Sequence, residues 1–303
     1  MSIPLAESIK KLKPFYLGVL LLTYALGSGI AIFLGEFIDL NIYWVGQSIV
    51  FLLLVFSYLI KAYFDVLDPG EFHRQYKSIA EKDKTGKIIR QTSSAFLLIA
   101  LAALTGVTVL LVLAYANGYL NPPLIILLGL AFLLSLFYST PPFRLVYSGY
   151  GELIQAVILT NITPAIGLLF QTGDFHRLLG MVTLPITILF IAMTVALSLK
   201  EYALDIKYER KNILTRMGWR KGIHFHNILA LSAYLMICMA AVLGLPWVLT
   251  WPVLTTIPLA IFQIWLLNSI LNGAAPRWGF IHFTAYALVV LNIYLVTFTL
   301  WVG

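Results

Sequence analysis

The sequence has little charge and almost no cysteine. Only 11% of its 303 residues are Asp, Glu, Lys or Arg, whereas 60% are hydrophobic. So little polar surface cannot cover a water-soluble globule. The single cysteine, Cys238, lies inside an apolar run and excludes a disulfide framework or a multi-cysteine metal site. We therefore expect a membrane protein, in which Cys238 has a packing role.

Long apolar stretches follow one another along the chain. A bilayer core about 30 Å thick needs roughly 20 mainly apolar residues per helix. By this measure the sequence predicts nine spans, at about 14–35, 42–64, 92–117, 121–139, 150–172, 178–199, 225–244, 251–271 and 278–301. The first run has no small-residue cleavage pattern and is expected to be retained. We predict an all-α integral membrane protein with nine transmembrane helices in a single bundle.

The basic residues predict how the bundle is oriented, because cytoplasmic loops carry an excess of Lys and Arg. With the N-terminus inside, the inner segments are 1–13, 65–91, 140–149, 200–224 and 272–277. Of the 20 basic residues, only Arg177 then lies on the opposite side. We therefore predict a cytoplasmic N-terminus. The net charge of +7 is attributed to topology, with no nucleic-acid partner.

Two of the predicted spans end in acid. Span two runs into Asp65, Asp68 and Glu71, and span six into Glu201, Asp205 and Glu209. A carboxylate at a membrane boundary is a functional candidate by default. Acids three or four residues apart share a helix face and repel unless a cation lies among them. Mg²⁺ suits such a place, since it binds one or two carboxylates and completes its shell with water and phosphate oxygens. One acidic segment alone would fit a solvated helix end better than a metal site. Two acidic segments on the same predicted side of the membrane favour a metal site.

Basic residues follow each acidic segment. They are Lys82, Lys84, Lys87 and Arg90 in the first loop, and Lys207, Arg210, Lys211 and Arg216 in the second. Metal and cationic side chains together stabilise the charge that develops on a leaving diphosphate. The two loops therefore predict a diphosphate site, although basic loops alone would be ordinary topological anchors. Span five adds Gln155 and Asn161, which either line a pocket or hydrogen-bond between helices.

Short motifs between the spans resemble those of one family. Residues 138–145 and 149–152 resemble the loop between the fourth and fifth helices of the UbiA-type intramembrane prenyltransferases. Residues 85–88 and 216–218 resemble the glycine-containing turns that precede that family's third and seventh helices. The two acidic segments fall where the family has its aspartate-rich motifs. The resemblance spans nearly the whole chain and implies one UbiA-type domain over residues 1–303.

The first motif departs from the family pattern. Asn-x-x-x-Asp-x-x-x-Asp falls here on Lys61, Asp65 and Pro69, so a lysine replaces the asparagine and the last acid is displaced to Asp68 or Glu71. Lys61 could pair with Asp65 and reduce metal affinity, or could itself hold a phosphate oxygen. The second motif, Asp-x-x-x-Asp, is matched by Glu201 and Asp205, with Glu209 as a possible further acid.

The resemblance implies Mg²⁺-dependent transfer of a polyprenyl group from its diphosphate to a small aromatic acceptor, carried out in the lipid bilayer. The implied metal ligands are Asp65, Asp68, Glu201 and Asp205. The implied diphosphate ligands are Lys61, Lys84, Lys87, Arg90, Arg144 and Lys207. Tyr63, Tyr138 and Tyr202 would face the carbocation, because a ring face attracts positive charge in a dry site. The active-site loops would lie on the cytoplasmic side of the cell membrane.

The acceptor is predicted from a smaller motif. Residues 149–153, Gly-Tyr-Gly-Glu-Leu, resemble the 1,4-dihydroxy-2-naphthoate branch, which serves menaquinone biosynthesis. Alternative acceptors are 4-hydroxybenzoate, a tetrapyrrole and a glycerol-phosphate lipid. Two other interpretations are a transporter and a catalytically degenerate, isoprenoid-binding homologue disabled by Lys61. Acids at the membrane edge, with a nearly uncharged midplane, argue against transport.

Overall fold

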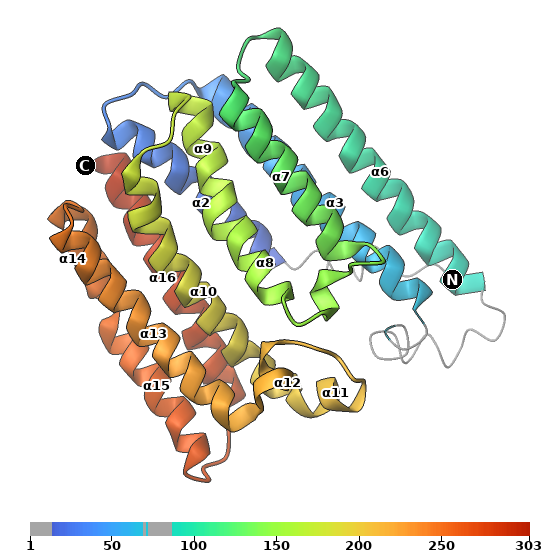
Figure 1. The fold of residues 1–303 in the computed structure, drawn as a ribbon, viewed down its shortest axis with the longest axis vertical. Helices are drawn as coiled ribbons and strands as arrows, with labels where there is room; N and C mark the ends of the chain where they lie inside the picture. The colour runs from blue at the N-terminus through green and yellow to red at the C-terminus, as the bar shows by residue number, and fades with distance from the viewer. Residues whose placement is uncertain (1–13, 69–70, 72–86) are drawn as a thin grey trace.

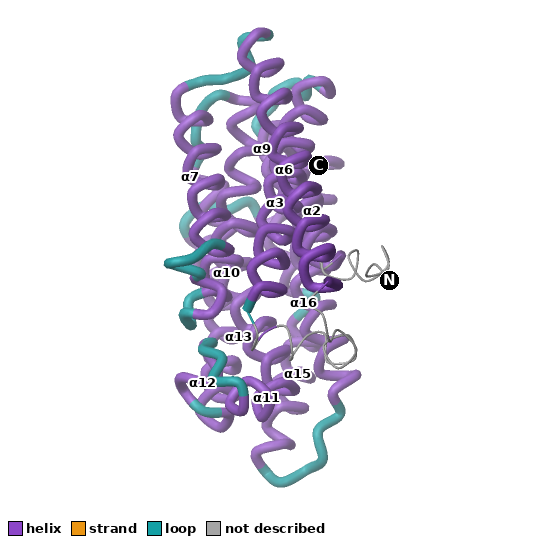
Figure 2. Tube along the Cα trace, turned by 90° about the vertical axis from the view of Figure 1, so that its right-hand side faces the viewer, coloured by secondary structure: helices purple, strands orange, loops and turns teal. Residues whose placement is uncertain are grey.

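The computed structural model describes residues 14–68, 71 and 87–303, with the backbone alone for residues 87–91. Within these residues, nine helical segments are long and apolar enough to cross a bilayer. They are Pro14–Phe33, Leu40–Leu67, Thr92–Ala116, Pro122–Ser139, Gly151–Thr172, Arg177–Lys207, Trp219–Val242, Trp247–Leu271 and Trp278–Val302. They lie side by side in one elongated bundle (Figures 1 and 2). The predicted nine-span, all-helical fold is therefore confirmed.

The first four spans are single helices. They are α2 (Pro14–Phe33), α3 (Leu40–Leu67), α6 (Lys87–Ala116) and α7 (Pro122–Ser139). Side-chain caps fix the starts of two of them: Asp39 accepts hydrogen bonds from the first backbone N–H groups of α3, and Asn121 accepts one from Leu124 in α7. On the other side of the bundle, α3 and α7 are joined by a hydrogen bond between the hydroxyls of Ser57 and Ser139.

The fifth span is interrupted at its centre. It consists of α8 (Gly151–Val157), the π-helical turn η2 (Ile158–Ile162) and α9 (Thr163–Thr172). Pro164 cannot donate a backbone hydrogen bond and its ring crowds the preceding turn. The turn widens, and the N–H of Thr163 bonds to the carbonyl of Ile158, five residues back. The helix thereby continues past the proline.

The second half of the bundle is more segmented. The sixth span is α10 (Arg177–Ser198), followed by the 3₁₀ turn η3 (Leu199–Glu201) and the short helix α11 (Tyr202–Lys207). The remaining helices are α12 (Ile213–Met217), α13 (Trp219–Val242), α14 (Trp247–Leu254), α15 (Ile257–Leu271) and α16 (Trp278–Val302). The seventh helix starts at Trp219, earlier than the predicted position 225. Arg220 and Lys221 lie in this helix. Polar residues lower the hydropathy, but they do not interrupt the backbone hydrogen bonds of a helix.

The centre of the bundle is built on close contacts at glycine. A Cβ atom at Gly27 of α2 would lie 1.9 Å from the carbonyl oxygen of Pro164, and one at Gly167 would lie 2.5 Å from the carbonyl oxygen of Tyr24. Small residues allow helix backbones to approach closely inside a membrane. These contacts place α2 directly against α9. The preceding helix α8, which η2 joins to α9, carries Glu152 and Gln155 at the other end of the same span.

Candidate functional site

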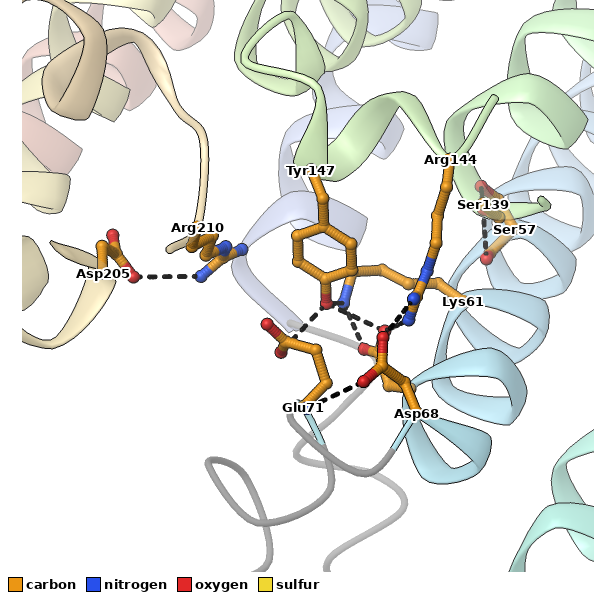
Figure 3. A network of polar contacts seen from close by, with 10 residues as sticks. Ser57, Lys61, Asp68, Glu71, Ser139, Arg144, Tyr147, Asp205 and Arg210 are labelled. Atoms are coloured by element: carbon orange, nitrogen blue, oxygen red, sulfur yellow. Dashed lines mark hydrogen bonds and ion pairs between the residues drawn. The ribbon is translucent and has the colours of Figure 1, made fainter. Parts of the chain in front are cut away.

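The first acidic cluster, which comprises Asp65, Asp68 and Glu71, lies at the end of α3. Asp65 is buried, and Lys61, one turn earlier on the same helix, places its Nζ 2.5 Å from the Oδ2 of Asp65. Arg144 comes from the connection between α7 and α8. Its two terminal nitrogens each lie 2.7 Å from a carboxylate oxygen, one on Asp65 and one on Asp68 (Figure 3). The guanidinium of Arg144 thus bridges two acids. The backbone of Arg144 lies in the left-handed region, with φ 37°.

Tyr147 lies between these charged groups. It comes from the short turn η1 (Leu145–Tyr147), and its hydroxyl lies 2.8 Å from Asp65 Oδ1, 3.2 Å from Glu71 Oε2 and 3.0 Å from Lys61 Nζ. Burial, together with the neighbouring carboxylates of Asp65 and Glu71, raises the pKa of Tyr147 well above its usual value. Tyr147 therefore remains a hydrogen-bond donor to the acids.

A second set of polar residues surrounds Asp205 on α11. Asp205 is buried, its Oδ2 accepts a hydrogen bond of 2.7 Å from Asn212, and its Oδ1 lies 3.7 Å from a guanidinium nitrogen of Arg210. The guanidinium carbon of Arg210 is also 5.1 Å from the centre of the Tyr147 ring. Burial lowers the pKa of Arg210, but the nearby Tyr147 and Asp205 outweigh it and raise the pKa overall. Arg210 is therefore a fixed cation between the two acidic groups (Figure 3).

A cavity of about 390 Å³ opens beside Arg210. Its lining combines aromatic rings with acids, amides and a guanidinium. The aromatic residues are Phe15, Tyr16, Tyr138 and Tyr286, and the polar residues include Glu152, Gln155, Glu201, Asp205, Arg210 and Asn212. A mixed lining of this kind suits a ligand with an apolar ring or chain and a charged or hydroxylated end.

Three buried polar atoms at this site have no hydrogen-bond partner among the residues that the structure describes. They are the Nε atoms of Arg144 and Arg210 and the Oε2 atom of Glu152. An unsatisfied buried polar group costs about 1–3 kcal/mol, and such groups are rare in folded proteins. Two guanidinium N–H groups would be satisfied by an anion, and the carboxylate oxygen by a hydroxyl. These atoms therefore fit a ligand that carries both.

Two loops are joined above the site by Arg216, which follows the second acidic segment. It donates a hydrogen bond of 2.5 Å to the carbonyl oxygen of Ser148 and stacks over Tyr150, with its guanidinium carbon 4.6 Å from the ring centre. Gly149 makes this possible, because its φ is +87° and a Cβ there would lie 2.3 Å from Arg216 Nε. The α7–α8 connection and the α11–α13 connection therefore form one unit.

Many of the predicted site residues lie together. The cluster around Asp65 contains Lys61, Asp68, Glu71 and Arg144. Four others line the cavity: Tyr138, Gln155, Glu201 and Asp205. Lys84 and the side chains of Lys87 and Arg90 lie outside the described residues.

Other predicted residues make contacts elsewhere. Tyr63 packs edge-on against Phe64, Tyr202 packs against the apolar core, and Lys207 lies over the ring of Tyr208. Glu209 is exposed. Asn161 hydrogen-bonds to Thr183 and Thr187 of α10. Of the two alternatives predicted for this residue, it therefore adopts the hydrogen bond between helices.

Three residues at the site were not predicted to have a role there, namely Tyr147, Glu152 and Asn212, and Arg210 was predicted only as one of the basic residues of the second loop. Arg210 and Glu152 had a signal, since one lies in the second basic loop and the other in the motif at residues 149–152. Tyr147 and Asn212 had none. A tyrosine between two motifs and an asparagine in a loop gain their partners only when distant helices pack together.

The bundle is apolar, and its polar site lies where α3, α7 and α10 end. These features define an integral membrane protein that is suited to an amphipathic ligand. A sequence profile of the UbiA prenyltransferase family matches residues 88–284. The chain belongs to the UbiA prenyltransferase family.

Individual relatives are distant. A 1,4-dihydroxy-2-naphthoate octaprenyltransferase of Bacillus subtilis (strain 168) is 23% identical over 160 residues, which are 53% of this chain and 42% of that relative. A UbiA homologue from Archaeoglobus fulgidus, solved bound to DMAPP and Mg²⁺, shares 15% identity with a TM-score of 0.60, over 94% of this chain and 97% of that one. A digeranylgeranylglyceryl phosphate synthase shares 16% identity with a TM-score of 0.58, over 97% and 98%. The two structures agree with this chain in fold.

The residues that line the cavity suit the metal with which the Archaeoglobus homologue was solved. Glu201 and Asp205 offer carboxylate oxygens, which are the ligands that Mg²⁺ prefers. Among the residues that the structure describes, no three acid, histidine or cysteine side chains gather closely enough to form a metal cage. Mg²⁺ bound here would therefore take much of its shell from water and from a ligand's phosphate oxygens.

Proposed function

We propose that this protein transfers a prenyl group from a prenyl diphosphate to a small aromatic acceptor. The observation that carries the proposal is the cavity of about 390 Å³ beside Asp205, in which aromatic rings meet the guanidinium of Arg210 and several acids. The apolar bundle around it would accept the isoprenoid chain. The family membership and the Archaeoglobus homologue bound to DMAPP and Mg²⁺ support the same assignment.

In this proposal the diphosphate lies beside Arg144 and Arg210, whose unpartnered Nε groups would donate hydrogen bonds to its oxygens. As the allylic C–O bond breaks, its electron pair passes to the diphosphate, and the fixed guanidinium groups stabilise the charge that develops there. Mg²⁺, when bound by Glu201 and Asp205, would add Lewis-acid stabilisation of the same leaving group. Lys61 would contribute a further cation from the first acidic cluster.

The carbon end of the substrate would face the aromatic part of the cavity. The faces of Tyr138, Tyr16 and Tyr286 are suited to an allylic cation, because a ring face attracts positive charge where water is excluded. The acceptor's ring carbon then attacks this cation and forms the new C–C bond, and its carboxylate leaves as CO₂, whose bonding electrons restore the aromatic ring. Oε2 of Glu152 would accept a hydrogen bond from an acceptor hydroxyl and so orient the ring.

For the acceptor we propose 1,4-dihydroxy-2-naphthoate, whose ring carbon would be alkylated with loss of its carboxylate. The name of the Bacillus relative supports this choice, although the match spans only 42% of that protein. A glycerol-phosphate lipid is the second candidate, because a digeranylgeranylglyceryl phosphate synthase has the same fold over nearly its whole length. The site would face the cytoplasm, as the distribution of Lys and Arg predicts.

The decisive test is the release of diphosphate from geranylgeranyl diphosphate by the purified protein in detergent, with and without Mg²⁺. The acceptors to compare are 1,4-dihydroxy-2-naphthoate, 4-hydroxybenzoate, a tetrapyrrole and a glycerol-phosphate lipid. We expect Mg²⁺-dependent release with the naphthoate. Asp205→Ala should abolish it, whereas Asp174→Ala, which changes an exposed acid after α9, should not. Release that survives Asp205→Ala would contradict the proposed site.

A further inference from the structure

The short helix α11 is polar on its inner side and apolar on its outer side. Asp205 is buried and points toward Asn212 and Arg210. Its two neighbours, Leu204 and Ile206, are instead 52% and 51% exposed. A helix that faces water buries its apolar side chains and exposes its charged ones, so α11 has the reverse arrangement. The outer side of α11 therefore suits an apolar neighbour better than it suits water.

The exposed apolar character continues beyond α11, and its position along the bundle explains it. Tyr208 and Met217 are also exposed. Figures 1 and 2 both show that α15 extends past the level of α11 and α12 before it ends. Because α15 belongs to the eighth span, α11 and α12 lie at the boundary of the bilayer, not in the water beyond it.

Basic side chains are interleaved with these apolar ones. Exposed cations on this side include Lys207, Lys211, Arg220 and Lys221. The Nζ atom of Lys207 lies 5.8 Å from the ring centre of Tyr208, and the guanidinium carbon of Arg220 lies 5.3 Å from that of Trp219. Aromatic rings beside Lys or Arg are typical of the level at which lipid headgroups lie.

The acids of the same segment do not balance these cations on the outer side. Asp205 is buried, and Glu201 lines the cavity on the inner side. Glu209 is the remaining acid of residues 200–221, and it is exposed. The outer side of α11 and α12 therefore combines apolar side chains with an excess of positive charge. This combination is typical of a helical segment that lies on an anionic membrane surface.

We propose that the outer side of α11 and α12 is a binding surface for anionic phospholipids. Leu204 and Ile206 would contact the upper part of the acyl chains, and Lys207 and Lys211 the phosphate groups. Each Lys or Arg close to an anionic membrane surface adds about a fivefold preference over a neutral surface. Asp205 lies on the opposite side of the same short helix, so bound lipid holds in place the helix that carries it.

A fluorescent probe on α11 tests this proposal. In a Cys238→Ser background, Ile206→Cys is labelled with an NBD maleimide. The protein is placed in nanodiscs of phosphatidylcholine alone, or of three parts phosphatidylcholine to one part phosphatidylglycerol. We expect a lipid that is spin-labelled near its headgroup to quench NBD more strongly in the anionic nanodiscs. Added salt should remove the difference, because it screens charges at a surface.

Two results of this measurement would overturn the proposal. Equal quenching in both kinds of nanodisc would show that neutral lipid is sufficient. Absence of quenching in both, as expected for the same probe at Ala275→Cys in the exposed connection between α15 and α16, would show that α11 faces water.

Matched charge variants test which cations are responsible. Lys207→Gln should reduce the difference between the two nanodiscs, and the double variant Lys207→Gln/Lys211→Gln should remove it. Arg277→Gln is the control, since it removes an exposed cation from the connection between α15 and α16 and should leave the difference unchanged. An equal loss in Arg277→Gln would show that total charge decides, and would overturn the assignment to α11 and α12.

The unlabelled protein gives a second measurement, in case the probe at position 206 prevents folding. Electron paramagnetic resonance compares the fractions of spin-labelled phosphatidylglycerol and phosphatidylcholine that the protein immobilises. We expect a larger fraction for phosphatidylglycerol, and a smaller excess in Lys207→Gln/Lys211→Gln. Equal fractions would contradict the proposal. An excess that inorganic phosphate lowers more than sodium chloride of equal ionic strength would assign the cations to a soluble phosphate ligand instead. None of these measurements depends on prenyl transfer.

Discussion

Tyr147 shows how a single side chain can join two charged groups of a site. Its hydroxyl contacts Asp65, Glu71 and Lys61, while the guanidinium carbons of Arg144 and Arg210 lie 4.7 and 5.1 Å from its ring centre. The edge of the ring supplies a polar group and its faces attract cations. Tyr147 therefore fixes the distance between the first acidic cluster and Arg210.

Removing the hydroxyl alone tests this role. We expect Tyr147→Phe to raise the KM for the prenyl diphosphate by about 10- to 100-fold, because hydrogen bonds to charged groups contribute about 1.5–3 kcal/mol. The KM for the acceptor should change little. Tyr150→Phe is the control, since Tyr150 uses its ring against Arg216 and the ring is retained. Equal effects of both variants would contradict the role given to the Tyr147 hydroxyl.

Glu152 allows the complementary test at the acceptor end. In Glu152→Gln the side chain keeps its shape, but one carboxylate oxygen becomes an NH₂ group, which donates hydrogen bonds and cannot accept one from a hydroxyl. We expect the KM for the aromatic acceptor to rise about tenfold, because the charge-assisted hydrogen bond is lost. The KM for the diphosphate should stay unchanged. Glu209→Gln, at an exposed acid, is the control, and an equal loss there would refute acceptor binding by Glu152.

The acids of the site could be predicted from the sequence because they are anomalous: Asp65 and Asp205 each follow a long apolar run. Arg144 could be predicted because it lies in a recognisable motif. Tyr147 is one of 16 tyrosines, a residue type common at membrane interfaces, and its position carries no special signal. Its role follows from the packing of η1 against α3, which depends on contacts between residues more than 75 positions apart.

At the scale of helices, the contact between α2 and α9 depends on glycine. We expect Gly27→Ala to destabilise the protein by about 1–3 kcal/mol, the usual cost of overpacking a tight contact. The new methyl group would overlap the backbone of Pro164, which cannot move aside as a side chain can. Gly18→Ala, on the same helix with no atom within 4 Å, should be neutral or slightly stabilising. Thermal unfolding in detergent measures both, and equal melting temperatures would contradict the prediction.

The connection between the two loops gives a second prediction at this scale. Gly149→Ala and Gly273→Ala both place a side chain at positive φ, which costs about 1–2 kcal/mol of stability. Only the Cβ at position 149 would collide with Arg216. We therefore expect a similar loss of stability in both variants, but a raised KM for the diphosphate only in Gly149→Ala. A raised KM in Gly273→Ala as well would show that strain alone is responsible.

The helix boundaries could be predicted where the apolar run and the helical hydrogen bonds end at the same residues. The caps at Asp39 and Asn121 lie within a few residues of the predicted boundaries. The segment 200–224 was predicted to lie between spans, with its acids spaced for one helix face, and most of η3, all of α11 and α12 and the start of α13 lie within it. A helix at the membrane surface can carry polar residues on several faces, so hydropathy does not mark its end. Within the second acidic segment, Glu201 ends η3, Asp205 lies on the short helix α11 and Glu209 follows that helix.

For the whole molecule, the distribution of basic residues predicts which side the site faces. In a Cys238→Ser background, a cysteine placed at exposed Ala275 should lie on the cytoplasmic side, and one at exposed Asn117 on the other. A membrane-impermeant maleimide should therefore label Asn117→Cys in right-side-out vesicles and Ala275→Cys in inverted ones. The opposite pattern would place the site outside.

The contact of Arg216 with Ser148 and Tyr150 has a thermodynamic consequence. One of the joined loops carries Arg144 and Tyr147, and the other carries Arg210 and Asn212. A diphosphate bound beside both Arg144 and Arg210, as proposed above, would contact both loops, and ordering one loop would remove part of the entropy that the joined loop still has to lose. The two loops would then strengthen each other's contribution to diphosphate binding by the same factor, so that they bind this one ligand cooperatively.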